Sequence, residues 1–289
     1  MAILQDIAGG FASQDLPEGM ILWAWLPDDA RLAECAQKLR ERLAALPDEL
    51  LEEGVPTLSE RTVDEEDWAE AWKAYWHPQR VGERLVIKPT WRDWPPADQP
   101  DLARSDDLVI ELDPGMAFGT GAHATTVLCL EALERALRQA CHPEEPPQAA
   151  TKDLGCRVLD LGCGSGILSI AALKLGGAAA LPIDTDPLAI AATAENCARN
   201  GVRCEPLLQA GLDGVGGAWD IVVANISLPI ILQAAPRVAE LLTPGGLFIC
   251  SGFYATRAEE IVAVLTPLGF ELVGVEEREY WGCLVARKS

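Results

Sequence analysis

The feature that most constrains the fold is an alternation of short apolar runs with helix-like segments, which begins near residue 107 and continues to the end of the chain. The strand-length runs include RVLDLG, AALPID, DIVVANI and GLFICSGF, with CEPLLQ as a weaker example. Apolar residues recur at helical spacing after most of them. Strands joined by helical crossovers run parallel, so the sequence predicts a doubly wound parallel sheet. The last two runs, FELVGVEERE and YWGCLVARK, predict a hairpin that adds an antiparallel strand at the end of the sheet.

The first hundred residues follow a different pattern. An apolar run at 21–26, ILWAWL, predicts a strand, and the segment after it predicts a helix. A second helix is predicted near 62–76, and the Pro-rich, charged segment 91–106 predicts a linker. A chain of 289 residues is long for one average domain. We therefore expect an N-terminal α+β domain at 1–90, a linker at 91–106, and a second domain at 107–289.

The composition restricts the partners and the compartment. The chain has 44 acidic and 23 basic residues, a formal net charge of -21, which disfavours a nucleic-acid-binding surface. Such a charge would attract a basic protein partner, and the alternative is that it only keeps the protein soluble. Nine cysteines, with no C-x-x-C pair, indicate reduced thiols rather than disulfides or a metal site. No secretory signal or membrane span is predicted. We expect a cytoplasmic monomer that binds neither metal nor membrane.

Two glycine-rich segments compete as the cofactor loop, LDPGMAFGTGAHATT at 112–126 and LDLGCGSG at 159–166. In a doubly wound sheet the ligand lies beyond the carboxyl end of the first strand, where glycines let the backbone turn sharply and approach it. Asp184 ends the next predicted strand, and 184 − 162 = 22 is close to the spacing at which a carboxylate binds ribose hydroxyls. Because the first segment has no such carboxylate, the second is the predicted cofactor loop.

Asp160, two residues before Gly162, indicates which cofactor binds. A dinucleotide would bring its pyrophosphate to this turn, and a carboxylate there would repel it. S-adenosylmethionine would bring a cationic amino group and a sulfonium, which a carboxylate favours. The alternative is that Asp160 only caps a helix or braces the loop.

Several segments carry a family resemblance. They are LDPGMAFGTGAHATT, DLGCGSGILSIAALKLG, IDTDPLAI, VANI and the upstream DEEDWAEAWKAYWHPQRVGERLVIKPTW. In these segments the chain resembles the class I S-adenosylmethionine-dependent methyltransferases, and specifically the ribosomal protein L11 methyltransferase family. The resemblance implies a seven-stranded Rossmann-like sheet that binds S-adenosylmethionine at 107–289, and a ferredoxin-like N-terminal domain at 1–90 that recognises the substrate. The short segment before ILWAWL lacks that domain's opening strand and helix, which indicates a truncated or rebuilt version.

The resemblance also implies the site residues. The implied cofactor contacts are Thr126, Asp160, Gly162, Gly164, Asp184 and Asn225. Asp184 would hold the ribose, and Asp160 would support the methionine amino group. Asn225 is the implied catalytic residue, because its side-chain oxygen can accept a hydrogen bond from an amine and orient the lone pair. His123 is interpreted as structural, with a proton acceptor as the alternative.

The implied reaction is methylation of lysine side chains, the N-terminal α-amine or both on a basic large-subunit ribosomal protein. Ile-Ser-Leu follows Asn225, without the Asn-Pro-Pro-aromatic pattern usual for planar amide or base amine substrates. Another protein or a small-molecule amine is the alternative substrate. The rival classes are a dinucleotide-dependent oxidoreductase and a non-catalytic protein that binds S-adenosylmethionine.

Overall fold

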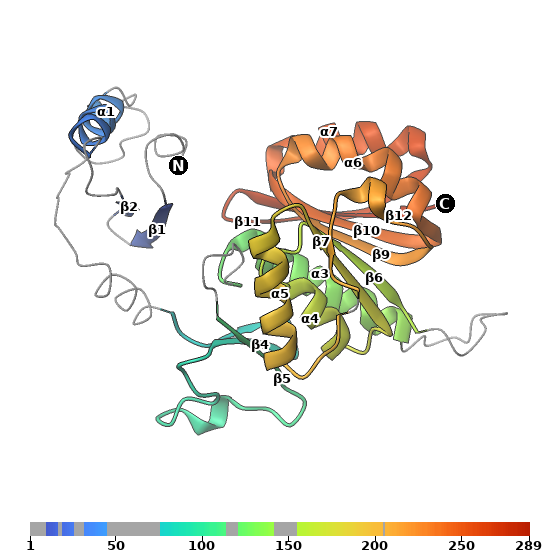
Figure 1. Cartoon of the computed structure of the whole chain (residues 1–289), viewed down its shortest axis with the longest axis horizontal. Helices are drawn as coiled ribbons and strands as arrows, with labels where there is room; N and C mark the ends of the chain where they lie inside the picture. The colour runs from blue at the N-terminus through green and yellow to red at the C-terminus, as the bar shows by residue number, and fades with distance from the viewer. Residues whose placement is uncertain are drawn as a thin grey trace. The chain divides into compact units, whose positions relative to one another are not determined.

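The computed structural model divides the chain into two compact units, 1–71 and 72–289 (Figure 1). The residues that the structure describes are 10–16, 19–25, 32–44, 76–113, 121–141, 155–204 and 206–289.

The first unit contains a strand that the sequence analysis did not predict. β1 (Gly10–Leu16) pairs antiparallel with β2 (Gly19–Trp25), and α1 (Leu32–Ala44) follows. The expectation that no strand precedes ILWAWL was therefore wrong. The run GFASQDL has few β-branched or aromatic residues, so its own propensity is weak, and it becomes a strand through backbone pairing with the apolar β2. Of the predicted linker helix, residues 62–75 lie outside the described residues.

The second unit is built on the predicted seven-stranded sheet, whose strand order is β11-β12-β10-β9-β6-β7-β8. The strands are β6 (Arg157–Leu161), β7 (Ala179–Asp184), β8 (Leu208–Gln209), β9 (Trp219–Asn225), β10 (Leu242–Tyr254), β11 (Phe270–Arg278) and β12 (Trp281–Lys288). Strands β6 to β10 are parallel, whereas β12 is antiparallel to both of its neighbours. The predicted doubly wound fold with an antiparallel strand at one end is confirmed.

Helices cover both faces of this sheet (Figure 1). The α-helices are α3 (Ala124–Cys141), α4 (Ile167–Lys174) and α5 (Pro187–Arg199) on one face, and α6 (Leu228–Leu241) and α7 (Ala258–Leu265) on the other. Short 3-10 turns are η4 (Leu212–Gly214), η5 (Ala255–Arg257) and η6 (Thr266–Leu268). Within the run CEPLLQ, only Leu208–Gln209 form a strand, and the short turn η4 follows it in place of an α-helix.

Successive side chains of the central strands pack on opposite faces of the sheet, in two separate apolar layers. Val158 and Val223 pack in the layer under α3 and α4, whereas Leu159 and Val222 pack in the layer under α6. All four side chains are fully buried. Because both faces of a parallel sheet are covered, its strands are continuous apolar runs, which explains why the sequence revealed them so clearly.

A second, three-stranded sheet packs against α3, α4 and α5, so that these helices lie between it and the main sheet (Figure 1). Its strands are β3 (Gln79–Val81), β4 (Leu85–Pro89) and β5 (Leu108–Leu112), with η3 (Pro100–Leu102) between the last two. The parallel pair β4 and β5 lies on either side of segment 91–106 in the sequence. The domain boundaries at residues 90 and 107 stay a prediction.

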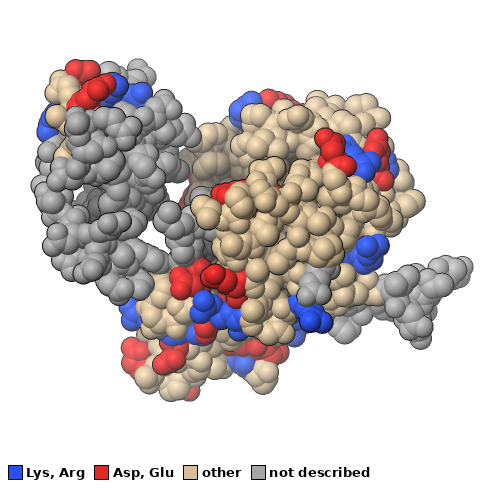
Figure 2. All heavy atoms as spheres, in the orientation of Figure 1, with Lys and Arg blue, Asp and Glu red and all other residues tan. Residues whose placement is uncertain are grey.

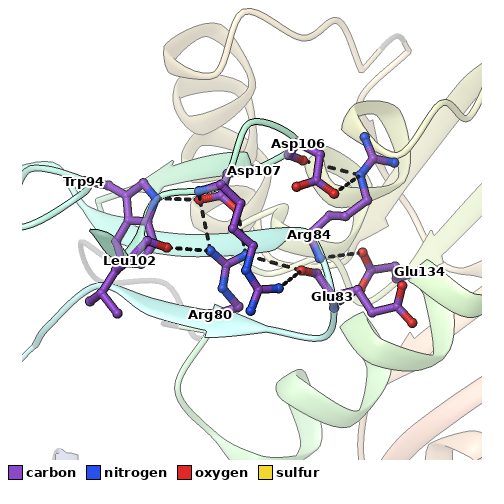
Figure 3. A network of polar contacts seen from close by, with 9 residues as sticks. Arg80, Glu83, Arg84, Trp94, Leu102, Asp106, Asp107 and Glu134 are labelled. Atoms are coloured by element: carbon purple, nitrogen blue, oxygen red, sulfur yellow. Dashed lines mark hydrogen bonds and ion pairs between the residues drawn. The ribbon is translucent and has the colours of Figure 1, made fainter. Parts of the chain in front are cut away.

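An ion pair holds this small sheet to the segment between β4 and β5 (Figure 3). Arg80 on β3 donates to both carboxylate oxygens of Asp107, at 2.6 and 3.0 Å, and the indole nitrogen of Trp94 donates to the same carboxylate at 2.9 Å. The Asp107 side chain is only 6% exposed. The Arg80 guanidinium beside it lowers the pKa of Asp107 to about 2. Because the Arg80–Asp107 pair is bidentate and nearly buried, it is stronger than an ordinary surface salt bridge.

We expect Asp107→Asn to lower the free energy of unfolding at neutral pH by about 1 to 3 kcal/mol, because it weakens charged hydrogen bonds in a nearly buried site. Since the folded-state pKa lies below the unfolded value, the stabilisation is present above about pH 4 and is lost as the pH falls towards about 2. Urea unfolding measures the change. The control is Asp106→Asn, whose exposed side chain pairs with Arg84 at 3.9 Å, and equal losses in both variants would contradict this account.

Candidate functional site

The turn after β6 requires glycine at several positions. Gly162, Gly164 and Gly166 have φ angles of +74°, +53° and +79°, in the left-handed region that glycine adopts readily. A Cβ on Gly162 would lie 2.5 Å from the side chain of Ile226, and one on Gly166 would lie 2.7 Å from Thr193. The turn therefore combines a left-handed backbone with close packing, and it leads directly into α4.

Asp184 lies against this turn at the carboxyl end of β7. One carboxylate oxygen accepts the N–H of Gly164 at 3.1 Å, and the other accepts the N–H of Asp186 at 3.0 Å. A carboxylate can accept about four hydrogen bonds, so both oxygens retain capacity for a further donor. The predicted proximity of Asp184 to the glycine turn is thus present in the structure, and the carboxylate is a suitable acceptor for a pair of hydroxyl groups.

Asp160 is fully buried at the end of β6. Its Oδ2 accepts the backbone N–H and the hydroxyl of Ser169, at 3.0 and 2.8 Å, which ties the carboxylate to the first turn of α4. Its Oδ1 is also buried and has no hydrogen-bond partner among the described residues. Burial raises the pKa of Asp160 to about 7. A buried carboxylate oxygen without a partner is unfavourable and would be stabilised by a cationic ligand.

Thr126 and Asn225 meet although 99 residues separate them. The Asn225 amide nitrogen at the end of β9 donates to the Thr126 hydroxyl at 3.1 Å. Thr126 is buried within the first turn of α3, whereas Asn225 is partly exposed. With its amide nitrogen directed to Thr126, Asn225 can offer its side-chain oxygen as an acceptor to another molecule.

His123 occupies the N-terminal end of α3. Its carbonyl accepts the N–H groups of Thr126 and Val127 at 2.9 and 3.1 Å, and its Nδ1 lies 2.8 Å from the Thr125 hydroxyl. Its ring lies edge-on against Trp281, with centroids 5.1 Å apart. Burial lowers the pKa of His123. These contacts are those of a residue that fixes the start of a helix.

Polar residues of α5 that were not predicted as site residues support the glycine turn. The Thr193 hydroxyl donates to the carbonyl of Gly164 at 3.0 Å, and the Asn196 amide donates to the carbonyl of Ser165 at 3.0 Å. Asn200, at the end of the helix, bonds both the N–H and the carbonyl of Glu111 on β5. Their i, i+3, i+7 spacing on an otherwise apolar face was the available signal.

The first glycine segment is described only at its ends, because residues 114–120, including Gly119, lie outside the described residues. Gly121 has φ +82°, and its carbonyl accepts the side-chain amide of Gln79 at 2.8 Å. A Cβ there would lie 2.9 Å from both Ile87 and Ile167. The end of the segment is therefore packed between the small sheet and α4.

Asp160, Gly162, Gly164, Asp184 and Asn225 lie along the edge of the main sheet formed by the carboxyl ends of β6, β7 and β9, and Thr126 lies in the first turn of α3. The structure brings four of them into two hydrogen-bonded pairs, Gly164 with Asp184 and Thr126 with Asn225, while Asp160 is hydrogen-bonded to Ser169 in α4. In the described part of the chain, no group of three or more His, Cys, Asp or Glu residues could hold a metal ion. No helix there is long and apolar enough to cross a membrane.

A family model and individual relatives with the same description both match this chain. The family model described as "Ribosomal protein L11 methyltransferase (PrmA)" matches residues 8–289. A relative of that name from Symbiobacterium thermophilum is 41% identical over 282 residues, covering 95% of this chain and 84% of the relative. One from Thermosynechococcus vestitus is 44% identical over 234 residues, covering 80% of this chain and 73% of the relative.

A solved structure is also similar. The crystal structure of ribosomal protein L11 methylase from Lactobacillus delbrueckii subsp. bulgaricus superposes with a TM-score of 0.62 at 31% sequence identity. The match covers 74% of this chain and all of that chain.

Proposed function

The chain belongs to the ribosomal protein L11 methyltransferase family, and from this premise we propose that it methylates lysine side chains, the N-terminal α-amine or both on ribosomal protein L11. It is an S-adenosylmethionine-dependent methyltransferase that acts on a ribosomal protein. The observation that supports the finer proposal most is the Thr126–Asn225 pair, which offers an amide oxygen at the same sheet edge as the glycine turn and Asp184.

The residues at this edge fit S-adenosylmethionine. The glycine turn lets the backbone approach a ligand closely, and the buried Asp160 Oδ1, which has no hydrogen-bond partner in the described part of the chain, matches a cationic amino group. In this proposal Gly162 and Gly164 contact the cofactor, Asp184 accepts hydrogen bonds from the ribose hydroxyls, and Thr126 lies near the methionine end. When bound, S-adenosylmethionine supplies an electrophilic methyl group on a sulfonium.

Asn225 would orient the attacking amine. Its side-chain oxygen accepts a hydrogen bond from the amine, and the Thr126 hydroxyl holds the amide in that orientation. Only a neutral amine can attack the methyl group, and a lysine with a pKa of about 10.4 is mostly protonated at neutral pH. Removal from water lowers the pKa of an amine, so a partly buried position beside Asn225 favours the reactive form.

The surface charge supports a basic substrate. The chain has a formal net charge of -21, which attracts a basic protein and repels nucleic acid. Figure 2 shows acidic and basic side chains mixed around the small sheet, whereas α5 presents mainly uncharged atoms on this face. We propose that the protein acts as a monomer without binding nucleic acid directly. Because its substrate is a ribosomal protein, we place it in the cytoplasm.

We expect the affinity for S-adenosylmethionine to fall below about pH 7. The ionised form of Asp160 favours the cofactor's positive charge, and the pKa of this carboxyl is about 7 in the free protein. Each pH unit below that value should weaken binding by up to about tenfold, because the carboxyl must first lose its proton. Calorimetry between about pH 5.5 and about pH 8.5 tests this. Asp160→Asn should bind more weakly and lose this dependence, whereas an unchanged profile in the variant would contradict the role of Asp160.

The function is tested with methyl-tritiated cofactor and purified ribosomal protein L11. We expect label in the protein, and mass spectrometry of its peptides identifies the amino groups that carry it. If the enzyme binds the cofactor and labels a different protein or a small amine in a bacterial extract, the alternative substrate class is correct. Binding of the cofactor without any labelled product would support a regulator. Tight binding of NAD without binding of S-adenosylmethionine would overturn the cofactor assignment.

A further inference from the structure

Two side-chain amides hold the described ends of the first glycine segment. At its start, the Oδ1 of Asn196 accepts the N–H of Asp113 at 3.3 Å. At its other end, the Nε2 of Gln79 donates to the carbonyl of Gly121 at 2.8 Å. Asn196 belongs to α5 and Gln79 to β3, so each end of the segment is fixed by a side chain from a different element.

Asn196 also joins this segment to the glycine turn. Its Nδ2 donates to the carbonyl of Ser165 at 3.0 Å, while its Oδ1 accepts the N–H of Asp113. Asn196 is 1% exposed and Ser165 is fully buried, so neither contact can be replaced cheaply by water. Next to Ser165, Gly164 donates its N–H to Asp184, the proposed ribose acceptor. One side chain therefore links the two glycine-rich segments that the sequence presents as rivals.

Gln79 acts where the first glycine segment enters α3. Gly121 lies two residues before His123, whose carbonyl accepts the N–H of Thr126 at 2.9 Å. The Thr126 hydroxyl accepts the amide of Asn225 at 3.1 Å. Gln79 thus holds the chain immediately before the helical turn that positions the Thr126–Asn225 pair.

The small sheet connects these two contacts. Gln79 pairs with Ile87 across β3 and β4, and Pro89 pairs with Leu112 across β4 and β5. Leu112 directly precedes Asp113, whose N–H reaches Asn196. Because hydrogen-bonded strands resist displacement relative to one another, the glycine turn and the start of α3 are held in one connected unit.

We propose that Asn196 and Gln79 are positioning residues for methyl transfer, which act through the groups they hold. Asn196 fixes the glycine turn in the form that binds S-adenosylmethionine, and Gln79 fixes the start of α3 so that the Asn225 amide keeps its orientation towards the amine. A displacement of about 1 Å in such an arrangement slows a reaction, because the reacting groups must remain aligned. This inference rests on the proposed function, which places the cofactor at the glycine turn and the amine beside Asn225.

The test of Asn196 is the Kd of S-adenosylmethionine, measured by calorimetry. We expect Asn196→Ala to raise Kd by about five- to twentyfold, while kcat with saturating cofactor falls less than about threefold. Asn196→Ser leaves a smaller void and a hydroxyl that can replace one contact, so it should raise Kd less. The matched control is Thr243→Ala, which removes a hydroxyl that donates to the carbonyl of Trp219 at 3.2 Å, at the amino ends of β9 and β10, and should leave Kd unchanged.

The test of Gln79 is kcat for methylation of ribosomal protein L11 with saturating cofactor. Gln79→Met keeps the length of the side chain but cannot donate to Gly121. We expect its kcat to fall by about three- to tenfold, with less than about a twofold change in the Kd of the cofactor. Gln79→Lys restores a donor and should recover part of the loss. The split between kcat and Kd distinguishes positioning from a general loss of stability, which thermal unfolding of each variant measures.

An unchanged Kd in both Asn196 variants would overturn the role of Asn196, and an unchanged kcat in Gln79→Met would overturn that of Gln79. Equal changes of Kd and kcat in Thr243→Ala would overturn both roles, because they would show that any loss of stability has the same effect. A wild-type protein that binds the cofactor but labels no substrate would instead refute the proposed function, and the Kd values of the Asn196 variants would still test the contact with the glycine turn.

Discussion

Asn225→Ala is expected to lower kcat for methyl transfer by about a hundredfold, with a much smaller change in the Kd of S-adenosylmethionine. The amide oxygen is the group proposed to accept a hydrogen bond from the amine, and its loss would leave the nucleophile without orientation. Asn225 ends β9 and is partly exposed, so truncation there removes little buried surface. The fold should therefore persist, as thermal unfolding would verify.

Thr126→Val is the matched variant for this prediction. Valine preserves the shape of the buried threonine but cannot accept the Asn225 amide, which now donates to the Thr126 hydroxyl at 3.1 Å. We expect a smaller loss of kcat than in Asn225→Ala, because the amide oxygen remains but is less well oriented. Near wild-type kcat in Asn225→Ala, measured with saturating cofactor and L11, would remove Asn225 from the mechanism.

Asp184→Ala is expected to weaken binding of S-adenosylmethionine by about 1 to 3 kcal/mol, or about five- to 150-fold in Kd, because ribose hydroxyls would lose their acceptor. Calorimetry measures the change directly. Asp184 also accepts the N–H of Gly164, so part of the loss could come from a displaced glycine turn. Asp184→Asn keeps one acceptor oxygen and should lose less affinity than the alanine variant.

Asp186→Ala is the control for this second prediction. Asp186 is two residues from Asp184 and caps α5 by accepting the N–H of Leu188 at 2.8 Å. Its removal should lower the free energy of unfolding by about 1 kcal/mol without a comparable effect on cofactor affinity. If Asp184→Ala binds the cofactor as tightly as wild type, the ribose assignment is wrong.

The main-sheet strands and the glycine turn could be predicted because each has a local sequence pattern that occurs in one kind of structural environment. The strands of the main sheet are buried on both faces, so each appears as an apolar run, and helical spacing marks the segments between them. The glycines at 162, 164 and 166 adopt the left-handed conformations that make glycine the favoured residue in such a turn. Prediction failed for β1, whose run GFASQDL has little strand propensity and depends on pairing with β2.

Contacts between distant segments were also beyond the reach of local pattern. Neither Thr126 nor Asn225 indicates its partner, because their hydrogen bond forms only when α3 packs beside β9. The support that Thr193 gives to the glycine turn depends in the same way on how α5 lies across β7. The spacing of Thr193, Asn196 and Asn200 within one helix was a signal for a polar stripe, but it does not identify the backbone groups that these side chains bind.

By itself the sequence determined the order of the strands and helices of the main sheet, the glycine turn and the acids near it, because side-chain periodicity and backbone freedom are local properties. Only the tertiary structure decided that a second sheet packs against α3, α4 and α5, that Asp160 keeps one buried oxygen without a described partner, and that the Trp281 ring contacts both Tyr254 and His123. The physical reason is that burial, strand register and ring contacts arise between residues far apart in the chain, and packing of the whole domain sets them.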